Sequence, residues 1–434
     1  MKIVLSTFGS FGDVHPYIAL ALELKRRGHH PLIATSEMYR EKLDALALEL
    51  HPVRPQLPSF DEPDEISRML EKMMDARRGT LAVINTLIVP HLRDIYEDLS
   101  VAVRGADLFV THPLSLPAPL IVEQTGIPWV SSVLAPISLF SAFDPSVPPQ
   151  LPAVYHLLKL HPLVGRMVLR LAKRKFDFLA RAVNELRAGV GLPPGGHPLF
   201  EAQHSPALVL ALFSRVLAAP QTDWPPQTRI TGFPFYDRRD RAGDDPRGLS
   251  PELLRFLDAG TPPIIFTLGS SAIWVARDFY RDSIAAARAL GQRALLLIGH
   301  ERNRPAELLP EGIAAFEYAP YGEVLPRASI VVHQGGVGTT GQTLRSGRPA
   351  LIVPFSHDQF DHAARIARLG CGRALPRTKY NAASATKELR AILGDESYKT
   401  TALEVGRRVQ VENGAVAACD AIEEMWKKIR SRGE

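Results

Sequence analysis

Short apolar runs alternate with longer helical patterns along most of the chain, and this alternation restricts the fold more than any other feature of the sequence. Strands are predicted at residues 3–7, 32–35, 108–111, 129–133 and 207–212. Helical patterns separate them at residues 16–27, 64–74, 80–99 and 157–186. Strands that are joined through helices pair in parallel, because the crossover returns the chain to the end of the sheet where it began. The first half of the chain is therefore predicted to form a parallel sheet with helices on both faces.

A proline-rich stretch divides this alternation into two halves. Eight prolines occur from Pro220 to Pro263. The pattern then restarts, with strands predicted at residues 264–268, 294–298, 330–333 and 350–353 and helices at 279–290, 339–346 and 359–369. A chain of 434 residues also exceeds the roughly 250 to 300 residues at which a single core stops growing.

We therefore predict an α/β protein with two Rossmann-like domains that face one another. The N-terminal domain is expected over residues 1–225, the linker over 226–262 and the C-terminal domain over 263–412. The last predicted helix, within residues 413–434, has no strand after it. We expect this helix to pack back on the N-terminal domain.

The composition indicates a folded protein and excludes several functional classes. Hydrophobic residues make up 46% and charged residues 22% of the chain, close to the average for globular proteins. The net charge is +5, but the basic residues are spread along the chain without a nucleic-acid-binding motif, so no nucleic-acid partner is expected. Two cysteines, no signal-peptide pattern and no run of 18 apolar residues predict a cytoplasmic protein without a transmembrane helix.

Residues 157–187 combine basic and apolar side chains more densely than the rest of the chain. The basic residues include Lys159, Arg166, Arg170, Lys173, Arg174, Lys175 and Arg181. Such a segment can lie on the inner face of a membrane as a peripheral contact. It can equally be an amphipathic helix that packs on its own domain and turns a basic face to water. The sequence leaves both interpretations open.

A glycine-rich turn at residues 334–338 follows the predicted strand that ends at His333. Glycines let the backbone approach a phosphate closely, and the free N–H groups at a helix start attract an anion. His333 adds a side-chain donor. The turn has neither the dinucleotide-binding nor the P-loop spacing. We predict a diphosphate site here, at the carboxyl end of a strand, where open α/β sheets bind ligands.

Asp358 and Gln359 come shortly after the next predicted strand, residues 350–353. A carboxylate and an amide together accept and donate hydrogen bonds, as the hydroxyl groups of a sugar require. Beside a diphosphate site, this pair is expected to hold the sugar of a nucleotide sugar.

These segments resemble the donor-binding signature of family 1 glycosyltransferases with the GT-B fold. The resemblance runs from Tyr318 through the glycine turn to Gln359. Residues 9–16 are similar to the acceptor-side loop of the same family. Residues 222–225, 231–234, 266–270 and 357–361 look most like bacterial rhamnosyltransferases that form rhamnolipids or modify flavonoids.

The resemblance implies a set of residues that bind a nucleoside-diphosphate sugar as co-substrate. They are Gly12, Ser270, Tyr318, His333, Gly335, Gly336, Gly338, Thr339, Asp358 and Gln359. His333 and the backbone of the glycine turn would contact the diphosphate, and Tyr318 would stack on the nucleobase. No metal is expected, because the helix start already supplies positive potential for the diphosphate.

Asp13 would be the catalytic base, because members of the family place His or Asp directly after the glycine of the first loop. Inverting transfer needs a group that accepts the proton of the acceptor hydroxyl. His15 is a rival, because an ordinary imidazole has a pKa near the operating pH. A third interpretation makes Asp13 only the cap of the following helix.

Gly341 stands where relatives that use a ribonucleotide place a Glu for the two ribose hydroxyls. The missing carboxylate favours a deoxyribonucleotide, and the resemblance to rhamnosyltransferases implies rhamnose, so dTDP-rhamnose is the preferred donor. The acceptor is expected to be a lipophilic small molecule such as a hydroxy-fatty acid lipid or a polyphenol. A UDP-glucose-dependent enzyme, another activity of the same fold such as an epimerase or phosphorylase, and a non-catalytic subunit remain as alternatives.

Overall fold

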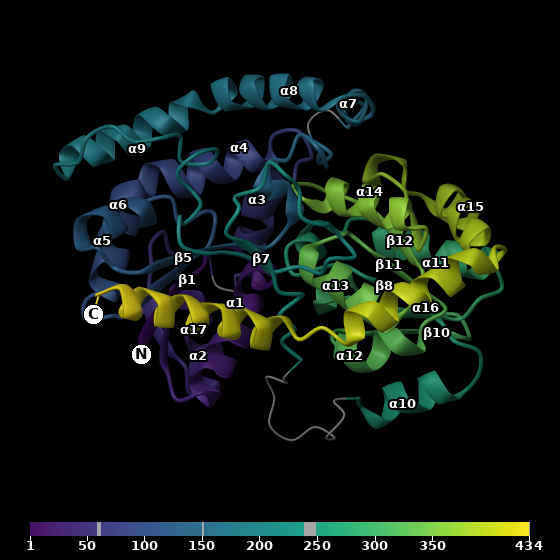
Figure 1. The fold of residues 1–434 in the computed structure, drawn as a ribbon. Coiled ribbons are helices and arrows are strands. Elements are labelled where there is room, and N and C mark those ends of the chain that lie inside the picture. Colours follow the sequence, from purple (N-terminus) through teal and green to yellow (C-terminus); the bar gives the residue numbers. More distant parts are fainter. Residues whose placement is uncertain (59–61, 150–151, 238–248, 434) are drawn as a thin grey trace.

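A computed structural model of the chain describes residues 1–58, 62–149, 152–237 and 249–433. Two sheets lie side by side, each with helices around it (Figure 1). Every strand pairing within both sheets is parallel. The predicted α/β class with two parallel sheets is therefore confirmed.

The N-terminal sheet has the strand order β3-β2-β1-β4-β5-β6-β7. Its strands are β1 Lys2–Ser6, β2 His30–Thr35, β3 Glu49–Pro52, β4 Leu108–Thr111, β5 Trp129–Val133, β6 Val209–Ala211 and β7 Thr228–Ile230. The helices of this half are α1 Phe11–Arg26, α2 Arg40–Ala45, α3 Pro63–Met73, α4 Gly79–Val83, α5 Leu92–Ala102, α6 Ala118–Thr125, α7 Val154–Leu158, α8 Pro162–Lys175 and α9 Asp177–Gly189.

The C-terminal sheet has the order β10-β9-β8-β11-β12-β13. Its strands are β8 Ile264–Thr267, β9 Ala294–Leu297, β10 Ile313–Phe316, β11 Ile330–His333, β12 Ala350–Ile352 and β13 Gly372–Ala374. The helices of this half are α10 Pro251–Asp258, α11 Phe279–Ala289, α12 Tyr321–Val324, α13 Val337–Ser346, α14 Gln359–Leu369, α15 Ala382–Leu393, α16 Glu396–Gln410 and α17 Gly414–Gly433.

Strand β1 shows how each sheet is buried on both faces. Ile3 and Leu5 are fully buried in one core cluster, which also contains side chains of α1 and α17. Val4 points to the other face and is fully buried in a second cluster, with side chains of α5 and α6. Alternate residues of a strand point to opposite faces, so the central residues Ile3, Val4 and Leu5 of this strand are all apolar.

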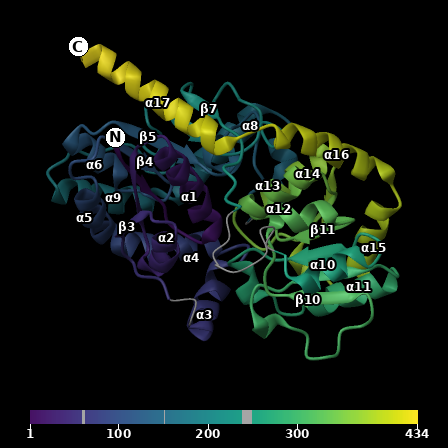
Figure 2. The ribbon, with the colours of Figure 1, turned by 90° about the horizontal axis from the view of Figure 1, so that it is seen from below.

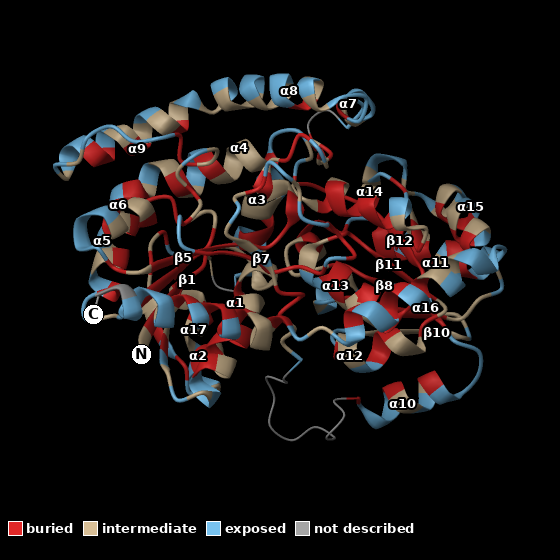
Figure 3. Ribbon diagram, viewed as in Figure 1, coloured by how far each residue is buried: buried red, intermediate tan, exposed pale blue. Residues whose placement is uncertain are grey.

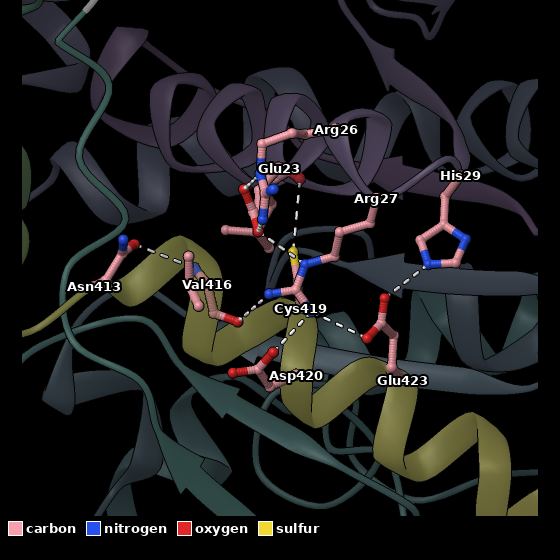
Figure 4. Close-up of polar contacts among 10 residues, drawn as sticks. Glu23, Arg26, Arg27, His29, Asn413, Val416, Cys419, Asp420 and Glu423 are labelled. Carbon is pink, nitrogen blue, oxygen red and sulfur yellow. Dashed lines mark hydrogen bonds and ion pairs between the residues drawn. The ribbon is translucent and has the colours of Figure 1, made fainter.

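Helix α17 leaves the C-terminal half and packs along α1 of the N-terminal half (Figures 1 and 2). Figure 4 shows the polar part of this contact. The Nη1 atom of Arg27 lies 2.7 Å from Asp420 Oδ1 and 3.0 Å from Glu423 Oε2. His29 Nε2 lies 3.0 Å from the other carboxylate oxygen of Glu423. The helix that carries Asp13 is thus held by the C-terminal end of the chain.

The chain passes between the two halves twice, first after β7 and again before α17, and these two connections are in contact. A Cβ atom on Gly414, at the start of α17, would lie 2.4 Å from the backbone carbon of Phe233 in the first connection. Residues 238–248 of the predicted linker lie outside the described residues. Strand β7 and helix α10 occupy the two ends of the predicted linker, so the connecting segment is shorter than residues 226–262.

Two long predicted helices are interrupted in the structure. The pattern at residues 80–99 becomes α4, a π-helical turn Ile84–Ile88, a 3-10 turn Val89–His91 and α5. The pattern at 157–186 becomes α7, α8 and α9. Pro90 lies at the first break and Pro162 begins α8, and proline cannot donate the backbone hydrogen bond that a continuous helix needs.

Candidate active site

His333 ends β11 and is completely buried. Its Nδ1 atom accepts a hydrogen bond of 3.0 Å from the backbone N–H of Gly335. Burial lowers the pKa of His333 to about 3, with a smaller contribution from the neighbouring His362. The neutral ring therefore carries its proton on Nε2, and this atom finds no hydrogen-bond partner among the described residues. An unpaired buried donor at this position fits an acceptor such as a phosphate oxygen.

The glycines of the turn differ in what surrounds them. Gly335 has φ +91°, and a Cβ atom there would lie 2.7 Å from Ile352 Cγ2. Cβ atoms on Gly336 and Gly269 would lie 2.6 and 2.1 Å from the amide nitrogen of Gln334. A Cβ atom on Gly338 would have no atom within 4 Å, so this glycine borders open space. The turn packs closely against Ile352 and Gln334, and it is open at Gly338, near the start of the following helix α13.

Helix α13 begins at Val337, two residues before the predicted start at Thr339. No described side chain caps its N-terminus, where Gly336 is the capping residue. The backbone N–H groups of the first turn are therefore available to an anion. The side chain of Thr339 instead interacts with the hydroxyl of Tyr321, which lies 2.8 Å from the hydroxyl of Thr267 at the end of β8.

Gln334 is buried beside the glycine turn, and the sequence analysis did not single it out. Its side chain is buried between the glycine turn and the loop after β8, and its Oε1 atom has no partner among the described residues. The neighbouring Ser270, a predicted donor-binding residue, lies half-buried on that loop. Gly269 and Gly336 both pack against the side-chain amide of Gln334, because a Cβ atom on either glycine would lie within 3 Å of its nitrogen.

Asp358 and Gln359 lie at the start of α14, directly after the loop that follows β12. Burial raises the pKa of Asp358 above its usual value, and the charge of Asp13 raises it further, while His362 and His357 oppose the shift. The two carboxylates come from different halves of the protein and are close enough to influence each other. The structure thus brings the predicted base and the predicted sugar ligand together.

Gln359 is used partly by the fold itself. Its Oε1 atom accepts hydrogen bonds from the backbone N–H groups of Phe355, at 2.8 Å, and Ser356, at 3.2 Å. These contacts shape the loop that presents Asp358. The assignment of Gln359 as a sugar ligand stays a prediction that rests on its amide nitrogen.

Asp13 forms a capping box at the start of α1. Its Oδ2 atom accepts from the backbone N–H of Ser10 at 2.8 Å, while the Ser10 hydroxyl accepts from the backbone N–H of Gly12. The N–H of Gly12 is therefore used within the cap. A Cβ atom on Gly9, which has φ +131°, would lie 2.3 Å from Asp13 Oδ2. The cap fixes one carboxylate oxygen and leaves Oδ1 for another partner.

That partner is His112, which the sequence analysis missed. It follows β4 directly, and its Nε2 atom lies 3.6 Å from Asp13 Oδ1. Its Nδ1 atom accepts from the backbone N–H of Leu114 at 3.1 Å, so the neutral ring carries its proton on the side of Asp13. The signal was available, because β4 neighbours β1 and a polar residue at the carboxyl end of that strand reaches the same edge.

His15 differs from an ordinary imidazole. Its ring lies between those of Phe11 and Tyr236, with centroids 5.0 and 5.1 Å away. Burial lowers its pKa to about 3, and Lys42 adds to the shift. The reason for considering His15 as a rival base, a pKa near the operating pH, therefore does not apply to this residue.

Tyr318 lies in the loop before α12, and 68% of its surface is exposed. This exposure leaves the ring accessible to a flat partner such as a nucleobase. Its stacking role stays a prediction.

Two family models match the chain, one in each half. Residues 3–135 match the N-terminal domain of glycosyltransferase family 28, and residues 284–418 match the C-terminal domain of proteins like erythromycin biosynthesis protein CIII. The O-mycaminosyltylonolide 6-deoxyallosyltransferase of Streptomyces fradiae is 31% identical over 99% of both chains. A sterol 3-beta-glucosyltransferase of Debaryomyces hansenii is 27% identical over 97% of this chain, which spans 26% of that longer protein.

Solved structures share the complete fold. The glycotransferase of kitacinnamycin has a TM-score of 0.68 at 22% identity, covering 98% of this chain and 99% of its own. The spinosyn rhamnosyltransferase has a TM-score of 0.65 at 16% identity, covering 98% and 100%. The predicted relationship is confirmed: the chain belongs to the family 1 glycosyltransferases with the GT-B fold and is a nucleotide-sugar-dependent glycosyltransferase.

Proposed function

We propose that this enzyme transfers a sugar, preferably rhamnose, from a dTDP-sugar to a hydroxyl group of a lipophilic small molecule, with inversion at the anomeric carbon. The nucleotide part of the proposal rests on one observation. A Cβ atom on Gly341 would lie 2.9 Å from the ring of Phe233, which is buried. An aromatic ring thus occupies the direction in which a Glu side chain would extend.

The neighbouring side chains do not replace that carboxylate. Gln342 donates from Nε2 to Asp237 Oδ1 at 2.8 Å and accepts from Arg345 Nη2 at 2.7 Å. Arg345 also holds both oxygens of Asp237, at 2.7 and 2.9 Å. The amide and the carboxylate nearest Gly341 are therefore engaged with each other. A ribose 2′-hydroxyl at this position would be buried without a good acceptor, whereas deoxyribose has no such group.

Two of the similar proteins support a deoxysugar and a thymidine nucleotide. The Streptomyces fradiae relative is named a deoxyallosyltransferase, and the spinosyn rhamnosyltransferase has been solved in complex with thymidine diphosphate. These names describe those proteins. For this chain they favour a thymidine nucleotide that carries a deoxysugar, and we prefer rhamnose among such sugars.

The chemistry follows from the positions of Asp13, His333 and α13. The acceptor oxygen attacks the anomeric carbon from the side of Asp13, and the bond from that carbon to the diphosphate breaks. The acceptor proton passes to Asp13. The developing charge on the diphosphate is stabilised by the first N–H groups of α13 and by His333 Nε2. These groups make a metal unnecessary in this proposal, so a chelator should leave transfer unchanged.

A UDP-glucose-dependent glucosyltransferase is the second candidate. The sterol 3-beta-glucosyltransferases among the relatives support it, and they also point to a lipophilic acceptor. Because lipophilic acceptors partition into bilayers, peripheral attachment to the inner face of a membrane is part of both versions.

Transfer assays with dTDP-rhamnose and UDP-glucose, each with sterol, polyphenol and hydroxy-fatty acid acceptors, test the function. We expect turnover with dTDP-rhamnose, and turnover with UDP-glucose alone would contradict the preferred donor. A double variant tests why the enzyme would prefer dTDP to UDP. Phe233→Ala with Gly341→Glu should raise the affinity for UDP relative to dTDP, and Phe233→Ala alone controls for the loss of packing.

A further inference from the structure

Helix α8 turns its largest apolar side chains to solvent. Leu163, Met167 and Leu171 are 62%, 56% and 55% exposed, and Leu157 and Leu160 on the preceding segment are 55% and 73% exposed. Isolated exposed leucines are common on proteins, but five within fifteen residues form a continuous stripe. The helix lies at the outside of the N-terminal half, above α4 (Figure 1), and much of its surface is exposed (Figure 3).

The side of α8 that packs on the protein is the opposite one. Gly165 is the buried residue of this helix, and a Cβ atom on it would lie 3.1 Å from Ala142. Residues four apart share one face of a helix, so Leu163, Met167 and Leu171 form one row. Gly165, two residues after Leu163, faces away from that row. Helix α8 therefore packs on its own domain through the side that carries Gly165 and leaves the row of Leu163, Met167 and Leu171 exposed.

Basic side chains form a second row beside the apolar one. Arg166, Arg170 and Arg174 are also four apart and are exposed. Lys159 and Lys175 add to the charge, whereas Lys173 pairs with Glu201. The sequence contains no Asp or Glu between Asp144 and Asp177. The surface, which we call the α8 face, consists of residues 157–175 with this apolar row and this basic row.

We propose that the α8 face docks on an anionic lipid bilayer, with the helix axis in the plane of the membrane. The apolar row would enter the boundary between headgroups and acyl chains, and the basic row would contact anionic headgroups. A second copy of the chain fits less well, because a symmetric contact would bring the two basic rows together without acidic partners. This inference rests on the membrane attachment named in the proposed function and identifies the surface that makes it, and it does not depend on the donor.

The α8 face is connected to the sugar site through one loop. Ala142 contacts Gly165 of α8, and the backbone N–H of Val147 donates to Asp361 Oδ1 on α14 at 3.2 Å. Asp144, between them, pairs with Arg365 and lies 2.8 Å from Arg368 of the same helix. The loop that contacts α8 thus also contacts α14, the helix that begins beside Asp358.

Vesicle co-sedimentation tests the proposal with the intact protein. We expect binding to phosphatidylcholine vesicles that contain phosphatidylglycerol, weaker binding to phosphatidylcholine alone, and loss of binding as salt increases. The triple variant Arg166→Gln, Arg170→Gln, Arg174→Gln should weaken binding by about a hundredfold, since each charge contributes roughly fivefold. The triple variant Leu163→Ser, Met167→Ser, Leu171→Ser should abolish vesicle binding.

Matched variants elsewhere separate this surface from total charge and hydrophobicity. Lys399→Gln, Lys428→Gln, Arg430→Gln removes three exposed cations, and Leu308→Ser removes a side chain that is 98% exposed. Both should bind vesicles like the original protein. Circular dichroism and thermal unfolding check that each variant folds. Equal binding of the α8 variants and the controls, absence of vesicle binding, or a dimer in sedimentation equilibrium that the leucine variant dissociates would each overturn the proposal.

Discussion

The Nε2 atom of His112 lies 3.6 Å from Asp13 Oδ1, while Ser10 holds the other oxygen of that carboxylate. The two residues follow neighbouring strands, β4 and β1. A distance of 3.6 Å exceeds a normal hydrogen bond, but catalytic contacts often shorten when substrate binds. These contacts orient the carboxylate of Asp13 to accept the proton of the acceptor hydroxyl. They also place the His112 ring beside that carboxylate, where it can stabilise the change in charge that the proton transfer causes.

Asp13→Asn should reduce the rate constant of transfer by at least a hundredfold, because a general base typically contributes that much or more. Asn can still accept from the Ser10 N–H, so the start of α1 should stay folded. The affinity for a nucleoside diphosphate, measured by calorimetry, should change little. Full activity of this variant would remove Asp13 from the base position.

His112→Gln should lower kcat by roughly tenfold or more and leave KM for the donor nearly unchanged, because His112 acts through Asp13. The pH profile of kcat is the decisive readout, since a purely structural residue would not move it. His29→Gln, on the far contact with α17, is the matched control and should keep the original profile. An unchanged profile in both variants would make His112 a packing residue.

His333→Ala and Asp358→Ala should affect different parts of the donor. Removal of the buried His333 donor should weaken dTDP binding by about 1 to 3 kcal/mol, or roughly fivefold to a hundredfold. Asp358→Ala should weaken binding of the nucleotide sugar but leave that of dTDP nearly intact. Calorimetry with both ligands checks this. Equal losses for dTDP in the two variants would show that the division is wrong.

Asp358→Asn should raise the midpoint of thermal unfolding at pH 7. The pKa of Asp358 is raised in the folded protein, so its ionised form is disfavoured there and reduces stability at a pH above that raised value. Asn removes this effect, and the difference between the two proteins should vanish below the unfolded pKa of about 3.9. Unfolding scans from pH 3 to 8 measure it. A variant that is less stable at pH 7 would contradict the direction of the shift.

The sequence was sufficient for the central strands but not for the edges of the sheets. Strands such as β1, β4, β8 and β11 are buried almost throughout and have continuous apolar runs. The strands that escaped prediction are β3, β7, β10 and β13, and each is the edge strand of its sheet. These edge strands are partly exposed. Strands β3, β7 and β13 mix polar with apolar residues, and β10 has two alanines at its centre, so their pattern is weaker.

The site was predictable where a motif is local in the sequence. The glycine turn at His333 and the pair at Asp358 each lie in one short segment. His112 and Phe233 act on Asp13 and Gly341, which lie about a hundred positions away in the sequence. The pairing of β1 with β4 brings His112 to Asp13, and the segment that connects the two halves brings Phe233 to Gly341. A single sequence contains no signal for the contact between Phe233 and Gly341.

Isothermal titration of the protein with dTDP and with UDP, under identical conditions and without a sugar attached, tests the central claim most directly. Because Phe233 fills the space beside Gly341, we predict that dTDP binds at least about fivefold more tightly, the lower end expected for one buried hydroxyl without a partner. Equal affinities, or tighter binding of UDP, would contradict the account.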